Sequence, residues 1–146
     1  HEFLEVVAML KRQVGDISLT TDIIVGFPGE TEQDFADTCK LVREVGFTKI
    51  HVFRYSRREG TPAASRTDQI PAETKERRAH ELSVLGDRLR IQYAQRHIGS
   101  HELVAVEQEG WGMTESYYKV RVDGFPQGAL VDVCLTGVDD AAIMRA

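Results

Sequence analysis

The sequence predicts two fold classes in one chain, an α/β part followed by a small antiparallel β-barrel of the OB type. Helix-like and strand-like apolar patterns alternate through the first part of the chain, whereas from Glu102 onward apolar residues recur at every second position. A charged, helix-like stretch lies between the two patterns. We therefore expect an α/β portion over residues 1–70, a connecting helix over 71–98 and a β-barrel over 99–146.

The α/β portion is predicted to run helix, strand, helix, strand. The first helix has apolar residues at helical spacing, and a strand follows over 18–25. Thr31 and Asp34 form a variant of the capping box, which predicts the start of a second helix that Gly46 ends. A second strand is predicted over 48–55, where β-branched and aromatic residues are frequent. Because a helix joins the two strands, we expect a parallel pair with a right-handed crossover, in a sheet that continues upstream of this chain.

The second half of the chain is predicted to hold the connecting helix and short strands. Residues 56–64 form a polar, basic loop, Pro71 suits the first turn of the helix, and Gly99 is expected to end it. Six cations are expected around this helix: Lys75, Arg77, Arg78, Arg88, Arg90 and Arg96. Strands are then predicted over 103–106, 118–122, 130–135 and 142–144, separated by turns at Gly110-Trp111-Gly112, Asp123-Gly124-Phe125-Pro126 and Thr136-Gly137. Such closely spaced strands indicate a closed barrel that buries its own edges.

Composition excludes several classes of protein. No apolar run approaches the roughly 20 residues that span a bilayer, and the N-terminus lacks the pattern of a signal peptide, which indicates a cytoplasmic protein. The two cysteines, Cys39 and Cys134, belong to no Cys-x-x-Cys or Cys/His motif, so we expect two core thiols and no metal site. The net charge is −5, and residues 99–146 hold only three Lys or Arg residues, so any phosphate-binding surface must be assembled locally.

The first candidate site is the turn that follows the first strand. In sheets of alternating strands and helices, ligands bind at the carboxyl ends of the strands, and glycine lets the backbone approach a ligand closely. The predicted cofactor-binding residues are Ile24, Gly26, Phe27, Gly29 and Glu30. The alternative is a plain strand-to-helix turn in which Glu30 only complements the amino end of the next helix.

The second candidate site is the loop after the second strand. Arg58 offers a planar fork for a carboxylate or phosphate, and Tyr55 offers a stacking face. The predicted substrate- or RNA-binding residues are Tyr55, Arg57, Arg58, Gly60 and Thr61. A solvated loop is the alternative, and His51 in the preceding strand is interpreted as a packed histidine rather than a base.

A third candidate site lies in the β-module. Tyr117, Lys119 and Arg121 combine an aromatic face with cations, a pairing that binds single-stranded or looped RNA. Alternation along the strand requires either Tyr117 or Tyr118 to be interior. Because the module is acidic, we expect the loop and the connecting helix to supply most of the positive charge for RNA binding.

Two segments, in this order along the chain, resemble the radical-SAM methylthiotransferases. They are Thr21-Asp22-Ile23-Ile24-Val25-Gly26-Phe27-Pro28-Gly29-Glu30-Thr31 and Phe53-Arg54-Tyr55-Ser56-Arg57-Arg58-Glu59-Gly60-Thr61-Pro62-Ala63. Residues 99–146 resemble the TRAM domain of that family, and Ile50-His51-Val52-Phe53 looks most similar to the subgroup acting on N6-threonylcarbamoyl-adenosine. The resemblance implies the last strands and helices of a partial radical-SAM barrel and a thiomethyl transfer onto a tRNA adenosine beside the anticodon. It also implies S-adenosylmethionine and two 4Fe–4S clusters as cofactors.

The resemblance also implies that much of such an enzyme lies outside this sequence. A radical cluster needs a Cys-x-x-x-Cys-x-x-Cys loop, which the sequence lacks. We therefore interpret the chain as a C-terminal fragment with no catalytic residue and no metal ligand of its own, inactive without the missing N-terminal part. The family usually has prolines at some of the positions of Arg54, Arg57 and Glu59, and the added cations favour contact with a nucleic-acid backbone.

Two other functions stay open. Relatives that thiomethylate a ribosomal protein share both motifs, and their loop and β-module would face a protein. A non-catalytic RNA-binding module with an α/β remnant is the third interpretation. Under the fragment interpretation, exposed apolar surface is expected where barrel strands are missing, which favours a non-biological dimer of the isolated chain.

Overall fold

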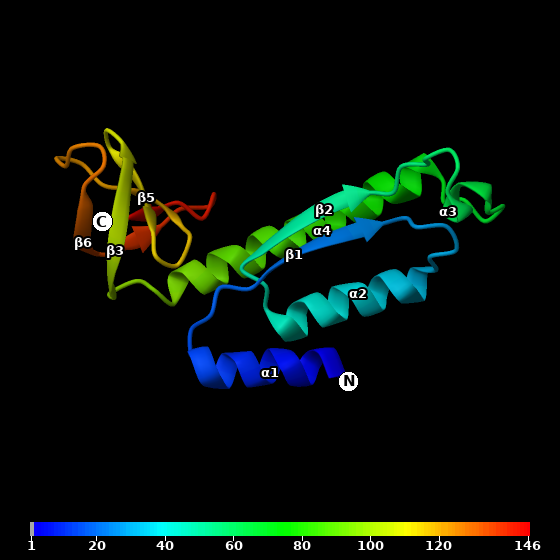
Figure 1. The fold of residues 1–146 in the computed structure, drawn as a ribbon, viewed down its shortest axis with the longest axis horizontal. Helices are drawn as coiled ribbons and strands as arrows, with labels where there is room; N and C mark the ends of the chain where they lie inside the picture. Colours follow the sequence, from blue (N-terminus) through cyan, green and yellow to red (C-terminus); the bar gives the residue numbers. More distant parts are fainter. Residues whose placement is uncertain (1) are drawn as a thin grey trace. The chain divides into compact units, whose positions relative to one another are not determined.

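The computed structural model describes residues 2–146, which form two compact units (Figure 1). One unit comprises Leu19–Gly86, and the other joins the residues up to Ser18 with Asp87–Ala146. Helix α4 (Ala72–Gln95) contributes residues to both units. No helix within the described residues is long and apolar enough to cross a membrane. The three-part division expected from the sequence stays a prediction.

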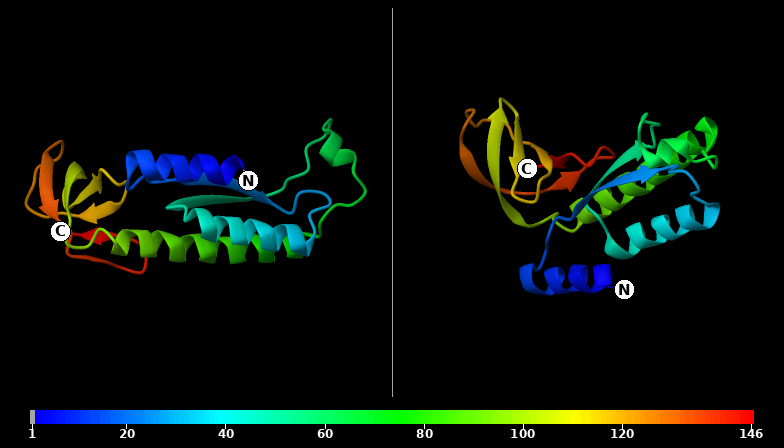
Figure 2. Two further views of the ribbon diagram at one scale, coloured as in Figure 1. Left: turned by 90° about the horizontal axis from the view of Figure 1, so that it is seen from below. Right: turned by 45° about the vertical axis from the view of Figure 1, so that its right-hand side comes forward.

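The unit Leu19–Gly86 is built on two parallel strands, β1 (Thr20–Val25) and β2 (Lys49–Arg54), joined by helix α2 (Glu32–Val45). Figure 2 shows α2 and the first part of α4 beside each other along the strand pair. Residues of both helices are buried: Phe35, Cys39, Val42 and Val45 from α2, and Leu82 from α4. The predicted parallel pair and its connecting helix are confirmed.

Local signals account for the ends of α2. The Asp34 amide donates to Thr31 Oγ1 at 3.1 Å and the Thr31 amide donates to Asp34 Oδ2 at 2.8 Å, so the predicted capping box is present. At the other end Gly46 has φ 65°, and its amide donates to the Val42 carbonyl at 3.0 Å. The sequence therefore predicts both ends of this helix.

One face of the β1–β2 pair is open within its unit. Ile24 and Phe53 lie opposite each other in the register and are 56% and 51% exposed. His51 pairs with Asp22 on the same face and is exposed, so its interpretation as a packed histidine is wrong. Strand alternation places His51 with Phe53, on the side away from Ile50 and Val52.

The loop after β2 contains a helical turn that the sequence pattern did not predict. Helix α3 (Pro62–Ser65) begins after Thr61, whose side chain accepts a hydrogen bond from the Ala64 amide at 3.3 Å. Pro62 occupies the first helical turn, where its missing N–H costs nothing.

The second unit combines helix α1 (Glu2–Val14), the end of α4 and one sheet. The strands of the sheet are β3 (His101–Gln108), β4 (Trp111–Thr114), β5 (Lys119–Arg121), β6 (Leu130–Cys134), β7 (Gly137–Val138) and β8 (Met144–Arg145). Their spatial order is β6-β3-β4-β5-β8-β7. Helix α4 ends at Gln95, and turns follow before Gly99, the residue expected to end it.

Topology forces this sheet to curl. Its two edge strands, β6 and β7, are separated in sequence only by Leu135 and Thr136. Three Cα steps span about 11 Å, whereas the edges of a flat six-stranded sheet lie about 24 Å apart. The curled sheet encloses a core that includes Val104, Val120, Val133 and Met144. The structure is therefore partly consistent with the predicted β-barrel: the sheet is curled, but its edge strands β6 and β7 do not pair with each other, and β5 and β8 pair in parallel.

Three details of the β-module correct the sequence analysis. Gly110-Trp111-Gly112 is not a turn throughout, because β4 begins at Trp111, and a Cβ on Gly112 would lie 2.4 Å from Val104 Cγ1. Gly137 likewise begins a strand where a turn was predicted. Cys134 is exposed because alternation turns Val133 inward, so a core thiol is found only at Cys39 among the described residues.

Candidate functional site

The turn after β1 is closed by its own hydrogen bonds. The Gly26 amide, at φ +72°, donates to Glu30 Oε2 at 2.6 Å, and the Glu30 amide donates to the Phe27 carbonyl at 2.9 Å. The Gly29 amide, at φ +85°, donates to the Asp68 carbonyl at 3.0 Å. The amides of Gly26, Gly29 and Glu30 are thus already bonded, and the exposed side chains of Ile24 and Phe27 are the part of this turn open to a ligand.

Glu30 also binds a buried arginine of α4. Arg78 Nη1 donates to Glu30 Oε2 at 2.5 Å and to the Glu30 carbonyl at 3.1 Å. Its Nη2 donates to Glu32 Oε1 at 2.6 Å, an atom that Arg77 Nη2 also reaches at 2.8 Å. The bonds from Arg78 and then Arg77 lower the pKa of Glu32. Burial lowers the pKa of Arg78, but its bonds with Glu32 and Glu30 outweigh this effect and raise it.

Two glycines of the turn are required by side chains of this chain. A Cβ on Gly26 would lie 2.1 Å from Lys75 Cγ, because the stem of Lys75 crosses the turn there. A Cβ on Gly29 would lie 2.4 Å from Arg66 Nη2 and 2.6 Å from Asp68 Oδ2, and these two residues form an ion pair. The glycines thus permit close internal packing, whereas the sequence analysis attributed them to the approach of a ligand.

The structure brings the first two candidate sites together. The Tyr55 amide donates to the Val25 carbonyl at 2.9 Å, and the rings of Tyr55 and Phe27 meet edge to face with centroids 5.2 Å apart. Lys75 Nζ donates to the Tyr55 carbonyl at 3.2 Å. The carboxyl ends of β1 and β2 therefore form one continuous surface.

The rest of the loop after β2 is more open. Arg57, Arg58 and Gly60 are exposed, and a Cβ on Gly60 would meet nothing within 4 Å. Thr61 caps α3 and its hydroxyl donates to the Arg58 carbonyl at 2.8 Å. Arg57 and Arg58 form no ion pair with any of residues 2–146, so their charge is available to a partner.

The outer face of the β-module gathers aromatic and cationic side chains. Lys119 Nζ lies 4.4 Å from the centroid of the Trp111 ring, and Arg121 Cζ lies 5.8 Å from it. Tyr117 is 76% exposed at φ 64°, whereas Tyr118 is buried, which confirms that one of the two is interior. Burial raises the pKa of the Tyr118 hydroxyl, which donates to the Arg90 carbonyl at 3.1 Å.

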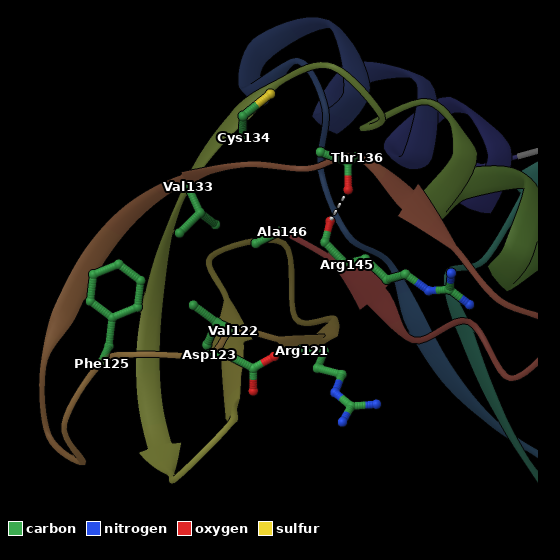
Figure 3. A pocket seen from close by; sticks show the side chains of 9 residues that line it. All are labelled: Arg121, Val122, Asp123, Phe125, Val133, Cys134, Thr136, Arg145 and Ala146. Atoms are coloured by element: carbon green, nitrogen blue, oxygen red, sulfur yellow. Dashed lines mark hydrogen bonds between the residues drawn. The ribbon is translucent and has the colours of Figure 1, made fainter.

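A cavity of about 650 Å³ lies beside this face. Arg121 and Arg145 are paired neighbours on β5 and β8, and both line it. Figure 3 shows the two arginines on one side of the cavity and Phe125 on the other. Neither arginine forms an ion pair with the residues that the structure describes. The lining therefore combines two arginines, the carboxylate of Asp123 and the apolar side chains of Val133 and Phe125.

Four residues of these surfaces were not predicted as site residues from the sequence: Lys75, Arg78, Trp111 and Arg145. Lys75 and Arg78 were expected around the helix as surface cations, but Arg78 is only 2% exposed and its carboxylate partners come from before and within α2. Trp111 was assigned to a turn, and Arg145 followed the last predicted strand. The apolar alternation that continues through Met144 was the available signal for Arg145.

No group of three His, Cys, Asp or Glu residues within 2–146 is arranged to hold a metal ion. Cys39 lies on the buried face of α2, and burial raises the pKa of its thiol. Cys134 lies in the other unit.

No protein-family model matches the chain. It is 42% identical over 144 residues to the tRNA-2-methylthio-N(6)-dimethylallyladenosine synthase of Bordetella pertussis, an alignment that covers 92% of this chain and 32% of the relative. The chain is similar to tRNA methylthiotransferases. The synthase of the same name from Methylacidiphilum infernorum is 44% identical over 108 residues, which cover 74% of this chain and 23% of the relative.

A methylthiotransferase with a different substrate name is also similar. The threonylcarbamoyladenosine tRNA methylthiotransferase of Bacillus subtilis is 39% identical over 124 residues, which cover 79% of this chain and 28% of the relative. The chain thus spans less than a third of the length of these methylthiotransferases. The relatives are methylthiotransferases, as the two sequence motifs indicated.

Proposed function

We propose that this chain is part of a radical-SAM tRNA methylthiotransferase and supplies one portion of the S-adenosylmethionine site together with an RNA-facing β-module. The observation that supports this most is the contact between the two motifs. The Tyr55 amide donates to the Val25 carbonyl at 2.9 Å, and the Tyr55 ring meets the Phe27 ring edge to face. Both motifs therefore line the carboxyl edge of one strand pair. The names of the relatives support the same activity.

The residues at this edge fit part of S-adenosylmethionine. Ile24 and Phe27 are exposed apolar side chains at the end of β1, and such a surface suits the flat adenine ring. When bound, S-adenosylmethionine would supply the radical chemistry. Because the described residues contain no metal-ligand group, we propose that the 4Fe–4S clusters are held by residues of the same protein outside this chain.

The β-module is proposed to contact the anticodon loop of tRNA. Trp111 offers a stacking face flanked by Lys119 and Arg121, and Arg145 adds a second guanidinium beside Arg121. Unstacked bases in RNA loops bind to aromatic faces, and their phosphates bind to such cations.

Two nucleosides are candidates for the substrate. The dimethylallyladenosine synthase of Bordetella pertussis has the higher identity over the longer alignment, which favours N6-dimethylallyl-adenosine. Ile50-His51-Val52-Phe53 favoured N6-threonylcarbamoyl-adenosine, and this substrate stays a prediction.

The test is to delete the gene and analyse the tRNA nucleosides by mass spectrometry. We expect the 2-methylthio form of one of these two adenosines to disappear and its unthiolated precursor to accumulate, with recovery when the full-length gene is restored. The mass of the precursor identifies the substrate. Unchanged thiomethylated adenosines would contradict the proposal, and loss of a thiomethyl group from a ribosomal protein would support the alternative substrate class.

A further inference from the structure

One cation in the unit Leu19–Gly86 is buried rather than exposed at the surface. Arg78 is 2% exposed, although the sequence pattern placed it among the surface cations of the connecting helix. Its guanidinium lies 5.6 Å from the centroid of the Phe35 ring and reaches two carboxylates, Glu30 at 2.5 Å and Glu32 at 2.6 Å. Because the Arg78 guanidinium is enclosed by protein, its contacts are with neighbouring residues of the fold.

The contacts of Arg78 lead directly to the first amide of the turn after β1. Glu30 Oε2 accepts from Arg78 Nη1 and also from the Gly26 amide at 2.6 Å. One carboxylate oxygen therefore joins helix α4 to the point where β1 ends. The Arg78 guanidinium also binds the Glu30 carbonyl at 3.1 Å, so it holds both the backbone and the side chain of that residue.

A second side chain of α4, that of Lys75, contacts the carboxyl end of β2 at the same edge of the strand pair. Lys75 lies one turn before Arg78, and its stem covers Gly26 where a Cβ would be. Its Nζ donates to the Tyr55 carbonyl at 3.2 Å, at the end of β2. The carboxyl ends of both strands are thus fixed to one face of α4.

The geometry points to Arg78 as a positioning residue for S-adenosylmethionine. It fixes the turn Gly26–Glu30 so that Ile24, Phe27 and the turn carbonyls keep the orientation that the cofactor meets. In this inference Glu30 acts through Gly26, because its Oε2 is shared between Arg78 and the Gly26 amide. The inference rests on the proposed function, which supplies the ligand.

A positioning role for Arg78 differs from a simple contribution to the stability of the fold. An intact buried ion pair contributes little net stability, because desolvation offsets most of the attraction. In this inference the ion pair of Arg78 with Glu30 instead selects one arrangement of the turn. Removal of Arg78 leaves the largely buried Glu30 carboxylate without its cation, so the carboxylate is expected to leave the Gly26 amide. Leu82 and the apolar face of α2 still hold the helices together.

The experiment uses the full-length protein that contains this chain, with its clusters in place. Arg78→Met removes the charge at similar length, and Arg77→Met is the matched control. Arg77 is the adjacent cation, reaches Glu32 but not Glu30, and its side chain is 50% exposed. Equilibrium affinity for S-adenosylmethionine is measured, together with hydrogen exchange of the peptide that contains residues 19–31.

We expect Arg78→Met to weaken binding of S-adenosylmethionine roughly tenfold to a hundredfold, by analogy with the loss caused by removing residues that orient the ligands of a metal ion. Exchange at the turn should accelerate in the same variant. Arg77→Met should change neither measurement by more than about twofold, because it leaves Glu30 in place. Equal affinity of Arg78→Met and the wild type would overturn the inference.

Two further variants keep the inference testable if the Arg78→Met protein fails to fold. Arg78→Lys keeps a charge near Glu30 but cannot bind two carboxylates in a fork, so we expect an intermediate loss of affinity. Glu30→Gln combined with Arg78→Met should be no worse than Arg78→Met alone, because both act through one contact. Full rescue by lysine, or additive losses in the double variant, would contradict the inference. A wild-type protein that binds no S-adenosylmethionine would instead refute the proposed function.

Discussion

Gly26, at the carboxyl end of β1, has a structural role different from the ligand-binding role that a glycine at this place predicts. Glycine in a Gly-Phe-Pro-Gly turn predicts a ligand that approaches the backbone, yet the space beside Gly26 is filled by the stem of Lys75. Its positive φ of +72° adds a second requirement for glycine. Both requirements exist whether or not a cofactor is bound.

The first of these requirements can be measured by comparing two glycines of the same unit. Alanine at positive φ costs about 1–2 kcal/mol, and this is the full expected effect of Gly60→Ala, where φ is +79° and a Cβ meets nothing within 4 Å. Gly26→Ala must also displace Lys75 from the Tyr55 carbonyl, which adds about 1 kcal/mol for the lost hydrogen bond. Urea unfolding of the two variants gives the free energies of unfolding. Equal losses would show that Lys75 moves aside without penalty.

Residues within a few positions of each other were predictable, and distant partners were not. Thr31 and Asp34 predicted the capping box because both lie in the turn that they cap. Arg78 gave no such signal, because Glu30 and Glu32 are 48 and 46 positions away. In the turn after β1, the sequence thus predicted the place of the candidate site but not what holds it.

At the scale of whole elements, the spacing of apolar residues predicted the three helices α1, α2 and α4, but it missed strand β4. Strand β4 (Trp111–Thr114) begins beside two glycines that indicate a turn. Gly112 is there because the Val104 side chain and the Ala105 carbonyl leave no room for a Cβ. That requirement comes from pairing with β3 and cannot be read from the local sequence.

The same strand carries the stacking face proposed for RNA. Trp111→Leu should weaken tRNA binding by the full-length protein by about 1–3 kcal/mol without changing its salt dependence, since stacking is not electrostatic.

Arg121→Gln should reduce the slope of log affinity against log salt by about 0.7–0.9, as loss of one phosphate contact does. Lys40→Gln, on the exposed side of α2, is the control and should leave both quantities unchanged. A filter-binding titration at several salt concentrations measures them. Identical slopes for wild type and Arg121→Gln would remove this face from the proposed RNA surface.

At the scale of the whole chain, each unit exposes apolar side chains. Ile24 and Phe53 are exposed on the open face of the β1–β2 pair, and α1 exposes Phe3, Val6 and Val14. Two parallel strands rarely form a sheet alone, because parallel sheets are normally covered on both faces. This supports the proposed fragment of a larger barrel, and dimerisation of the isolated chain through such surfaces stays a prediction.

The cysteines allow the fragment interpretation to be tested on this chain itself. A 4Fe–4S cluster needs several thiolates at one place, whereas Cys39 is buried on α2 with a raised thiol pKa and Cys134 lies in the other unit. After anaerobic reconstitution with iron and sulfide, the 146-residue chain should therefore retain no stoichiometric iron and no visible cluster absorbance. The full-length protein, treated in the same way, should retain both. Stoichiometric iron in the short chain that disappears in a Cys39→Ser and Cys134→Ser double variant would place a cluster on these thiols and contradict the assignment of the clusters to residues outside the chain.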